Sequence, residues 1–292
     1  MSSNTQPATW RGLTSAQAHV VTRRLPFTIA GVRAGSVLRE HVELIGDLLA
    51  QRDGWRLSAQ EGVNLDLPRE ARDEALAALN QTLHAAGHIR GWRHEPYAVF
   101  DRPGAEPLAI IERAASRFWG TTTLGAHATG YVADEHGHPT HLWIARRSLS
   151  KAVDPGQLDN LVGGGVPWPQ SPYETLVREG WEEAGLPPER MRQAVAGRVM
   201  HLCRDIAEGL QVEWLHSHEL RLPAGEVPVN QDGEVAEFMC LPVAEALERA
   251  ASAEMTTDAA LVTLDFALRH ALIEPDEAAA LTRRLDAISL PR

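Results

Sequence analysis

The sequence predicts an α/β protein with an amino-terminal accessory α/β domain, a second α/β domain and a helical carboxy-terminal tail. Helical and strand patterns alternate from residue 13 to about residue 100, as is typical of α/β domains. Strands then flank a glycine-rich segment and a capped helix, and residues 243–287 have mostly helical periodicity. With 292 residues, of which 44% are apolar, the chain can bury a sizeable core.

Residues 1–105 are assigned to the accessory domain. Its predicted elements are, in order, a helix at 15–23, a strand at 27–32, a helix at 37–49, a strand at 55–57 and an amphipathic helix at 69–86. The connection Asp101–Pro107 is rich in proline and glycine, which marks it as the domain boundary. We find no catalytic motif in this part of the sequence.

The second domain, residues 106–245, is predicted to begin with a helix at 108–118. Strands follow at 126–132, 142–147, 197–202, 212–220 and 236–241. The first two are joined by a turn at 134–139. The turn region contains His136, His138 and His141, which could suggest a zinc site. No fourth ligand accompanies them, so we interpret them as exposed histidines of a hairpin turn. The tail, residues 246–292, is predicted to be helical and to pack on this domain.

The segment between Ser171 and Gly185 is predicted to be a short helix. Ser171 is a favourable N-cap, Pro172 suits the first helical position, and Glu174 completes a capping box. Gly185 and the prolines after it end the helix. The start and stop signals therefore agree.

Three glutamates lie on one side of this helix. At about 100° per residue, Glu179, Glu182 and Glu183 fall within an arc of roughly 100°. Glutamates three and four positions apart repel by about 0.2–0.5 kcal/mol per pair, and no basic residue follows four positions later. A divalent cation would relieve this repulsion, and the alternative is a solvated acidic face. The opposite side, which is predicted to face the core, carries Tyr173, Val177 and Trp181.

Upstream, a short apolar segment leads into Gly163, Gly164 and Gly165. Glycine allows close approach to a ligand and positive φ, so these residues are predicted to form a loop. Together with the acidic helix, this loop resembles the Nudix box, and the matching positions are Gly164, Arg178, Glu179, Glu182, Glu183, Gly185 and Leu186. The sequence departs from the pattern at Gln170, in place of its first glutamate, and at Gly180, in place of an aliphatic residue.

The resemblance implies a Nudix α/β/α sandwich and a diphosphate hydrolase. It assigns Glu179, Glu182 and Glu183 to the binding of Mg²⁺ or Mn²⁺, and Arg178 to the orientation of Glu179. One glutamate that is not fully engaged by the metal would accept the proton of the attacking water. Because the three glutamates are intact, we interpret Gln170 as the loss of a supporting residue.

Further candidate residues lie before and after the helix. Three cations lie just upstream of the glycine segment: Arg146, Arg147 and Lys151. They could bind the substrate phosphates, or they could equally well be solvated residues at the end of a strand. The glycine segment and the aromatic residue after it are candidates for substrate binding: Gly164, Gly165 and Trp168. Nudix folds often draw another metal ligand or general base from the region before the last strand, which points to Glu234 and Glu237.

A narrower resemblance extends over nearly the whole chain. Trp92–Tyr97, Leu158–Asn160 and Ala260–His270 are similar to Nudix proteins related to the amino-terminal region of thiamine pyrophosphokinases. That group implies thiamine diphosphate or its oxidised forms as substrate, cleaved to the monophosphate and phosphate. The alternatives are a hydrolase of a nucleotide sugar or other nucleoside diphosphate derivative, and a non-catalytic Nudix binding module.

Charge and cysteine content restrict the partners and the compartment. The formal net charge is -11 and basic residues are not clustered, which argues against nucleic acid. Met1–Gln6 lacks a signal core and no apolar run is long enough for a membrane span, so we expect a cytoplasmic protein. Cys203 and Cys240 are interpreted as buried reduced thiols. The expected partner is a small diphosphate, and a homodimer is compatible with the sequence.

Overall fold

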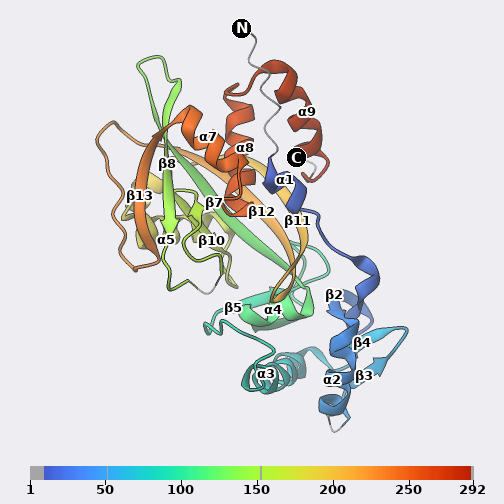
Figure 1. The fold of residues 1–292 in the computed structure, drawn as a ribbon. Helices are drawn as coiled ribbons and strands as arrows, with labels where there is room; N and C mark the ends of the chain where they lie inside the picture. The colour runs from blue at the N-terminus through green and yellow to red at the C-terminus, as the bar shows by residue number, and fades with distance from the viewer. Residues whose placement is uncertain (1–9, 51, 152, 291–292) are drawn as a thin grey trace.

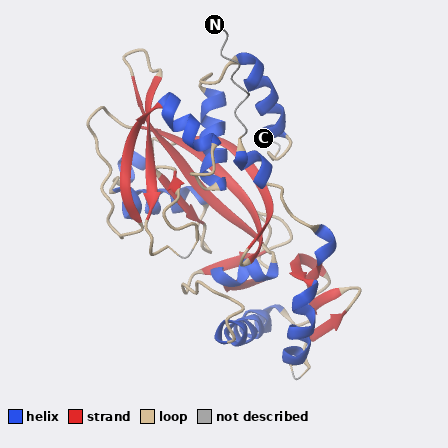
Figure 2. Ribbon diagram, in the orientation of Figure 1, coloured by secondary structure: helices blue, strands red, loops and turns tan. Residues whose placement is uncertain are grey.

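The computed structural model describes residues 10–50, 52–151 and 153–290. The first nine residues of the predicted accessory domain and the last two of the predicted tail lie outside these ranges. Figure 1 shows a small lobe from the early part of the chain beside a larger lobe with long strands and the carboxy-terminal helices. Helices and strands are mixed in both lobes, which confirms the α/β class (Figure 2).

A four-stranded sheet with two flanking helices forms most of the small lobe. The strand order is β2-β1-β4-β3, and only the β1–β4 pair is parallel. The elements are β1 (Arg24–Ile29), β2 (Val32–Leu38), α2 (Arg39–Leu49), β3 (Trp55–Ser58), β4 (Gly62–Leu65) and α3 (Arg69–Ala85). The strand predicted at 55–57 and the helix predicted at 69–86 are confirmed.

The helix predicted at 15–23 is wrong, while the strand predicted at 27–32 and the helix predicted at 37–49 are confirmed in part. In place of a helix at 15–23, the structure has α1 (Arg11–Ser15) and a 3-10 turn at Val21–Arg23. The strand predicted at 27–32 ends at residue 29, and part of the helix predicted at 37–49 belongs to β2. The chain reverses at Ala30 and Gly31, which have φ of 51° and 77°, so β2 pairs with β1.

Two short strands and a helix connect the lobes. β5 (Pro96–Val99) pairs with β6 (Ala109–Glu112), so the helix predicted at 108–118 is a strand in its first part. The helical part is α4 (Arg113–Trp119), which Glu112 caps by accepting the Ala114 N–H. Trp119 is fully buried in the core of the small lobe. That core therefore continues past the boundary predicted after residue 105.

A seven-stranded sheet lies at the centre of the large lobe. Five strands have the order β11-β12-β7-β8-β13, while β10 pairs with β7 and β9 with β8. All five strands predicted in this domain are confirmed. The strands are β7 (Thr122–Ala133), β8 (Pro139–Arg147), β9 (Leu158–Asp159), β10 (Val162–Gly165), β11 (Val195–Ile206), β12 (Gly209–Arg221) and β13 (Val235–Pro242).

Helices cover both faces of this sheet, which confirms the α/β/α sandwich (Figure 2). On one face, α5 (Pro172–Ala184) and α6 (Pro188–Met191) enclose a core that includes Ala126 and Leu176. On the other face, Ile144 and Leu215 contact a core formed with the tail helices. These are α7 (Val243–Ala251), α8 (Thr257–Arg269) and α9 (Pro275–Asp286).

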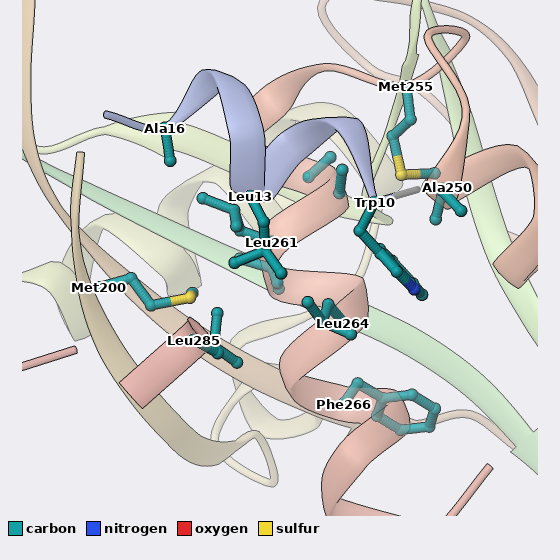
Figure 3. Close-up of a cluster of buried hydrophobic side chains, with 14 of the residues drawn as sticks. Trp10, Leu13, Ala16, Met200, Ala250, Met255, Leu261, Leu264, Phe266 and Leu285 are labelled. Carbon is teal, nitrogen blue, oxygen red and sulfur yellow. The ribbon is translucent and has the colours of Figure 1, made fainter. Parts of the chain in front are cut away.

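The helix α1 packs on the tail, although it comes first in the chain. Figure 3 shows Trp10 and Leu13 beside Leu261 and Leu264 of α8. Residues 10–16 thus share a core with the tail and not with the small lobe. The tail is helical as predicted, and its last two helices, α8 and α9, are separated near Ala271, which has a left-handed φ of 51°.

Two further sequence expectations can be compared with the described residues. None of the helices in this part of the chain is long and apolar enough to cross a membrane. Cys203 and Cys240 are both free thiols, and Cys203 is half-buried. The predicted burial of Cys240 is wrong, because this residue lies exposed on β13 at the edge of the sheet.

Candidate active site

The helix α5 begins and ends where the sequence predicts. The Ser171 hydroxyl accepts the N–H of Glu174 at 3.2 Å, and the Glu174 carboxylate accepts the N–H of Ser171 at 2.8 Å. Gly185 ends the helix with φ of 64° and donates its N–H to the Trp181 carbonyl at 2.9 Å. Local hydrogen bonds thus determine the length of the helix that carries the three glutamates.

The orientation of α5 differs from the prediction. Tyr173 and Trp181, expected to face the core, are 41% and 52% exposed. Leu176 and Ala184 are buried against the sheet instead, and Gly180 lies under Met191, whose side chain a Cβ at residue 180 would meet at 2.5 Å. This rotation turns two of the glutamates inward.

The three glycines before α5 form strand β10 and not a loop. None of them is among the residues with positive φ. Glycine is required at these positions because neighbouring side chains lie directly over the strand and leave no room for a Cβ atom. A Cβ at Gly164 would collide with the Glu179 carboxylate, and one at Gly165 would collide with the Tyr97 hydroxyl.

Arg178 binds two of the glutamates. Its guanidinium donates to Glu179 at 2.7 Å and also to Glu182. The cation that relieves the repulsion between the glutamates therefore lies four residues before Glu182 and not four residues after it. Its Nε donates to the Gln170 amide oxygen at 3.3 Å, and the Thr175 hydroxyl donates to the same oxygen at 3.0 Å. Gln170 therefore supports Arg178 as a neutral acceptor.

Glu183 is the most buried of the three glutamates. It is 5% exposed, accepts the N–H of Gly163 at 2.9 Å, and lies 3.6 Å from the Lys151 ammonium group. Burial, and then the charge of Glu179, raise the pKa of Glu183 to about 8. Lys151 also forms an ion pair with Glu234, which brings a second predicted residue next to Glu183.

The two candidate arginines of β8 lie on opposite faces of the sheet. Arg147 points toward α5 and donates to Asp159 at 2.8 Å. Arg146 points to the other face, where it pairs with Glu237 at 3.3 Å. The structure therefore brings Arg147, Lys151 and Glu234 to Glu183, but not Arg146 and Glu237. A cavity of only about 10 Å³ lies among Ala145, Arg147, Lys151, Asp159, Asn160, Glu183, Glu234 and Val235.

A larger groove, of about 1030 Å³, lies elsewhere on the lobe. It is lined by residues of β11 and β12, including Arg198, Trp214 and His216, and by Asp286, Ser289 and Leu290. None of the predicted site residues lines it. The small cavity beside Glu183 is therefore the better guide to the chemistry, because it has the buried charged groups.

Residues of the small lobe reach the same region, and the sequence analysis did not select them. Arg93 forms an ion pair with Glu234 at 3.1 Å, and Arg113 forms one with Glu95 at 2.8 Å. Tyr97 lies between them in sequence and over Gly165 in space. The one sequence signal for this segment is Trp92–Tyr97, which carries part of the narrower resemblance.

The donor chemistry of the site fits a hard divalent cation. Glu179 and Glu183 are buried carboxylates four positions apart, and the charge of one raises the pKa of the other. Within residues 10–50, 52–151 and 153–290, however, no group of three acidic, histidine or cysteine side chains is arranged to hold a metal ion. Arg178 and Lys151 bind the carboxylates instead.

Two family models together match most of the chain. Residues 123–260 match the NUDIX domain, and residues 10–123 match a domain of unknown function, DUF4743. The junction of the two matches lies at the start of β7, just after the core of the small lobe ends. Residues 123–260 are thus similar to the NUDIX domain, and the residues before them are similar to DUF4743.

Curated relatives are similar over about three quarters of the chain. The chain is 38% identical over 213 residues to Nudix hydrolase 24, chloroplastic, of Arabidopsis thaliana, a match that covers 73% of this chain and 58% of that protein. It is 37% identical over 230 residues to Nudix hydrolase 20, chloroplastic, of the same plant, covering 77% and 60%. The chain is therefore similar to these two Nudix hydrolases and spans about 60% of their length.

A solved structure is also similar. The crystal structure of DR0079 from Deinococcus radiodurans matches 59% of this chain and 99% of its own chain, with 22% identity and a TM-score of 0.44.

Proposed function

We propose that the chain is a metal-dependent Nudix hydrolase that cleaves a small diphosphate to the monophosphate and phosphate. The observation that supports this most strongly is the buried pair of Glu179 and Glu183 between α5 and the glycine strand. Carboxylates buried together require nearby positive charge, and phosphate groups require it as well. Arg178, Lys151 and Arg147 lie around this pair.

Mg²⁺ or Mn²⁺ would be held by Glu179, Glu182 and Glu183, and when bound it neutralises negative charge on the phosphate oxygens. Arg178 orients Glu179 and Glu182 through its two hydrogen bonds. Lys151 holds Glu183 and Glu234 together, so Glu234 is better placed than Glu237 to accept a proton in this site.

For the substrate, we propose thiamine diphosphate or its oxidised forms. A cationic thiazolium ring favours an aromatic face, and three tryptophans can be compared as its source: Trp92, Trp119 and Trp168. Trp119 is fully buried and donates to Asn80 at 2.7 Å, and Trp92 packs on the core of the small lobe. Trp168 is 43% exposed and follows Gly165 closely, so it supports this proposal best. The cytoplasmic location and a homodimer stay predictions.

A substrate panel tests both levels of the proposal. We expect phosphate release from thiamine diphosphate with Mg²⁺, and a kcat/KM for it or an oxidised form above those for ADP-ribose and a nucleotide sugar. Oxidation removes the thiazolium charge and about 0.5–2 kcal/mol of cation–π attraction, so preference for oxidised forms requires other contacts. If a nucleotide sugar or ADP-ribose is better by about tenfold or more, the thiamine proposal fails and the diphosphatase remains.

Gln170→Glu, which restores the Nudix pattern, is expected to change kcat/KM by less than about tenfold, because the three ligand glutamates are already present. The Gln170 amide oxygen also already accepts the hydrogen bonds that a carboxylate would accept. Initial rates on the preferred diphosphate measure the effect, with Gln170→Ala as the control that lacks the acceptor. A gain of about 10³-fold or more would instead identify the natural chain as an impaired enzyme and favour the non-catalytic binding module.

A further inference from the structure

The segment 93–113 connects the small lobe to the Nudix site. Figure 1 shows β5 and α4 between the small sheet and the large one. The Trp168 N–H donates to the Pro96 carbonyl at 2.7 Å, directly after the glycine strand. Every residue of this segment belongs to the DUF4743 domain. The domain of unknown function therefore touches the part of the Nudix domain that carries the glutamates.

Arg113 is the cation of this segment that lies nearest the glycine strand. Its guanidinium lies 5.8 Å from the centre of the Tyr97 ring, and a Cβ at Gly165 would lie 3.6 Å from its Cζ atom. Its side chain is 35% exposed, so an anion can reach it. Burial lowers the pKa of Arg113, but the nearby acidic groups Tyr97, Glu95 and Glu179 raise it overall, so the guanidinium is a permanent cation.

The Tyr97 hydroxyl lies beside this cation without a partner. Tyr97 is 4% exposed, and its hydroxyl makes no hydrogen bond within the described part of the chain. Leaving a buried hydroxyl unpaired is unfavourable, which indicates that a ligand completes it. Burial raises the pKa of Tyr97 to about 12, so the hydroxyl keeps its proton and is a donor at neutral pH.

Arg93 supplies a second connection from the same segment. It pairs with Glu234, which in turn pairs with Lys151 beside Glu183. Two arginines and a free hydroxyl from DUF4743 thus border the same site from one side. This combination suits a phosphate group, which accepts from a guanidinium and a hydroxyl together.

We infer that the DUF4743 domain forms one wall of the Nudix site, in which Arg113 and the Tyr97 hydroxyl bind the phosphate end of a diphosphate. This inference deepens the proposed function and rests on it for the identity of the ligand. It gives the accessory domain a role in binding substrate, in addition to any role in stability.

Binding of methylene diphosphonate with Mg²⁺, measured by calorimetry on the full chain, tests the inference without turnover. Arg113→Ala is expected to weaken binding by about 10- to 100-fold and Tyr97→Phe by about 3- to 10-fold, since each removes a hydrogen bond to phosphate. Arg113→Lys keeps the charge and is expected to lie between the wild type and Arg113→Ala. The control is Arg69→Ala, which removes a comparably exposed ion pair with Asp73 on α3.

Tyr97→Phe separates a ligand contact from a structural one. Removing an unpaired hydroxyl is expected to leave the melting temperature unchanged or higher, while KM for the diphosphate rises. If Arg113→Ala and Tyr97→Phe both bind the diphosphonate within twofold of the wild type, the inference is wrong even when the wild type hydrolyses diphosphates. If the wild type binds the diphosphonate through Arg113 but hydrolyses no diphosphate in the panel, the proposed catalytic function is wrong and the inferred role of DUF4743 in binding is supported.

Discussion

Glu183→Gln is expected to lower kcat by at least about 10²-fold while the protein stays folded, because it replaces a carboxylate that would bind the metal with a neutral amide of the same volume. Glu183 is held by the Gly163 N–H and by Lys151, so the glutamine keeps a hydrogen-bonded position. Glu182→Gln is expected to act in the same direction. Steady-state kinetics with Mg²⁺ and circular dichroism measure activity and folding.

The matched control for this prediction is Glu237→Gln. Glu237 was a sequence candidate, but it pairs with Arg146 on the other face of β8, so its loss is expected to change kcat by less than about twofold. A folded Glu183→Gln protein with a near-normal rate would contradict the metal assignment.

The same substitution is expected to change the pH dependence of stability. The pKa of Glu183 is raised to about 8 in the folded protein, chiefly by burial. Its contribution to stability is therefore fully present below the unfolded pKa of about 4.3 and is lost as the pH rises through about 8. Glutamine does not ionise, so the Glu183→Gln protein does not lose stability as the pH rises. The melting temperature of this variant at pH 8 should therefore equal or exceed that of the wild type. A lower one would show that the charged carboxylate stabilises the fold.

Asp265→Ala is expected to destabilise the protein by about 3–5 kcal/mol, because it removes the fully buried carboxylate that two partly buried arginines, Arg198 and Arg269, share. Asp265 on α8 is completely buried and accepts hydrogen bonds from Arg198 at 2.7 Å, Ser217 at 2.7 Å and Arg269 at 3.1 Å. The bonds from Arg198 and Ser217 attach the tail to β11 and β12, while the bond from Arg269 lies within α8. Urea unfolding of the variant and the wild type gives the difference.

Asp286→Ala is the matched control, since Asp286 also pairs with Arg198 but is 57% exposed. Its loss is expected to cost at most about 1 kcal/mol. Burial raises the pKa of Asp265, but Arg269, Arg198 and Ser217 outweigh it and lower the pKa overall. The stabilisation from Asp265 is thus present above the unfolded pKa and is lost as the pH falls through the lower, folded value. Equal stability of Asp265→Ala and the wild type would show that the tail is held by its apolar core alone.

The sequence predicted the elements whose signals are local. The capping box and Gly185 predicted the limits of α5, and periodicity predicted α3 and the five long strands of the large sheet, although not β9 and β10. The failures involve pairing between strands or breaks within helical patterns. Strand β2 depends on a reversal at Ala30 and Gly31, and β6 was taken for helix because its pattern is short.

Within the site, the sequence identified the glutamates, Arg178, Lys151 and Glu234 as candidates. It did not identify Arg113 or Tyr97, because no spacing connects residues 97 and 113 to a helix that begins at residue 172. It also misjudged Trp181, since the periodicity of one helix shows which residues share a side but not which side packs.

The sequence by itself therefore determined the Nudix box, the extent of its helix and the identity of the acidic groups, all of which depend on neighbours within a few turns of the chain. Only the tertiary structure decided that Glu179 and Glu183 are buried, that Lys151 and Glu234 meet beside Glu183, and that DUF4743 reaches this site. The physical reason is that burial and ion pairing depend on segments distant in sequence that pack against each other, which no local pattern specifies.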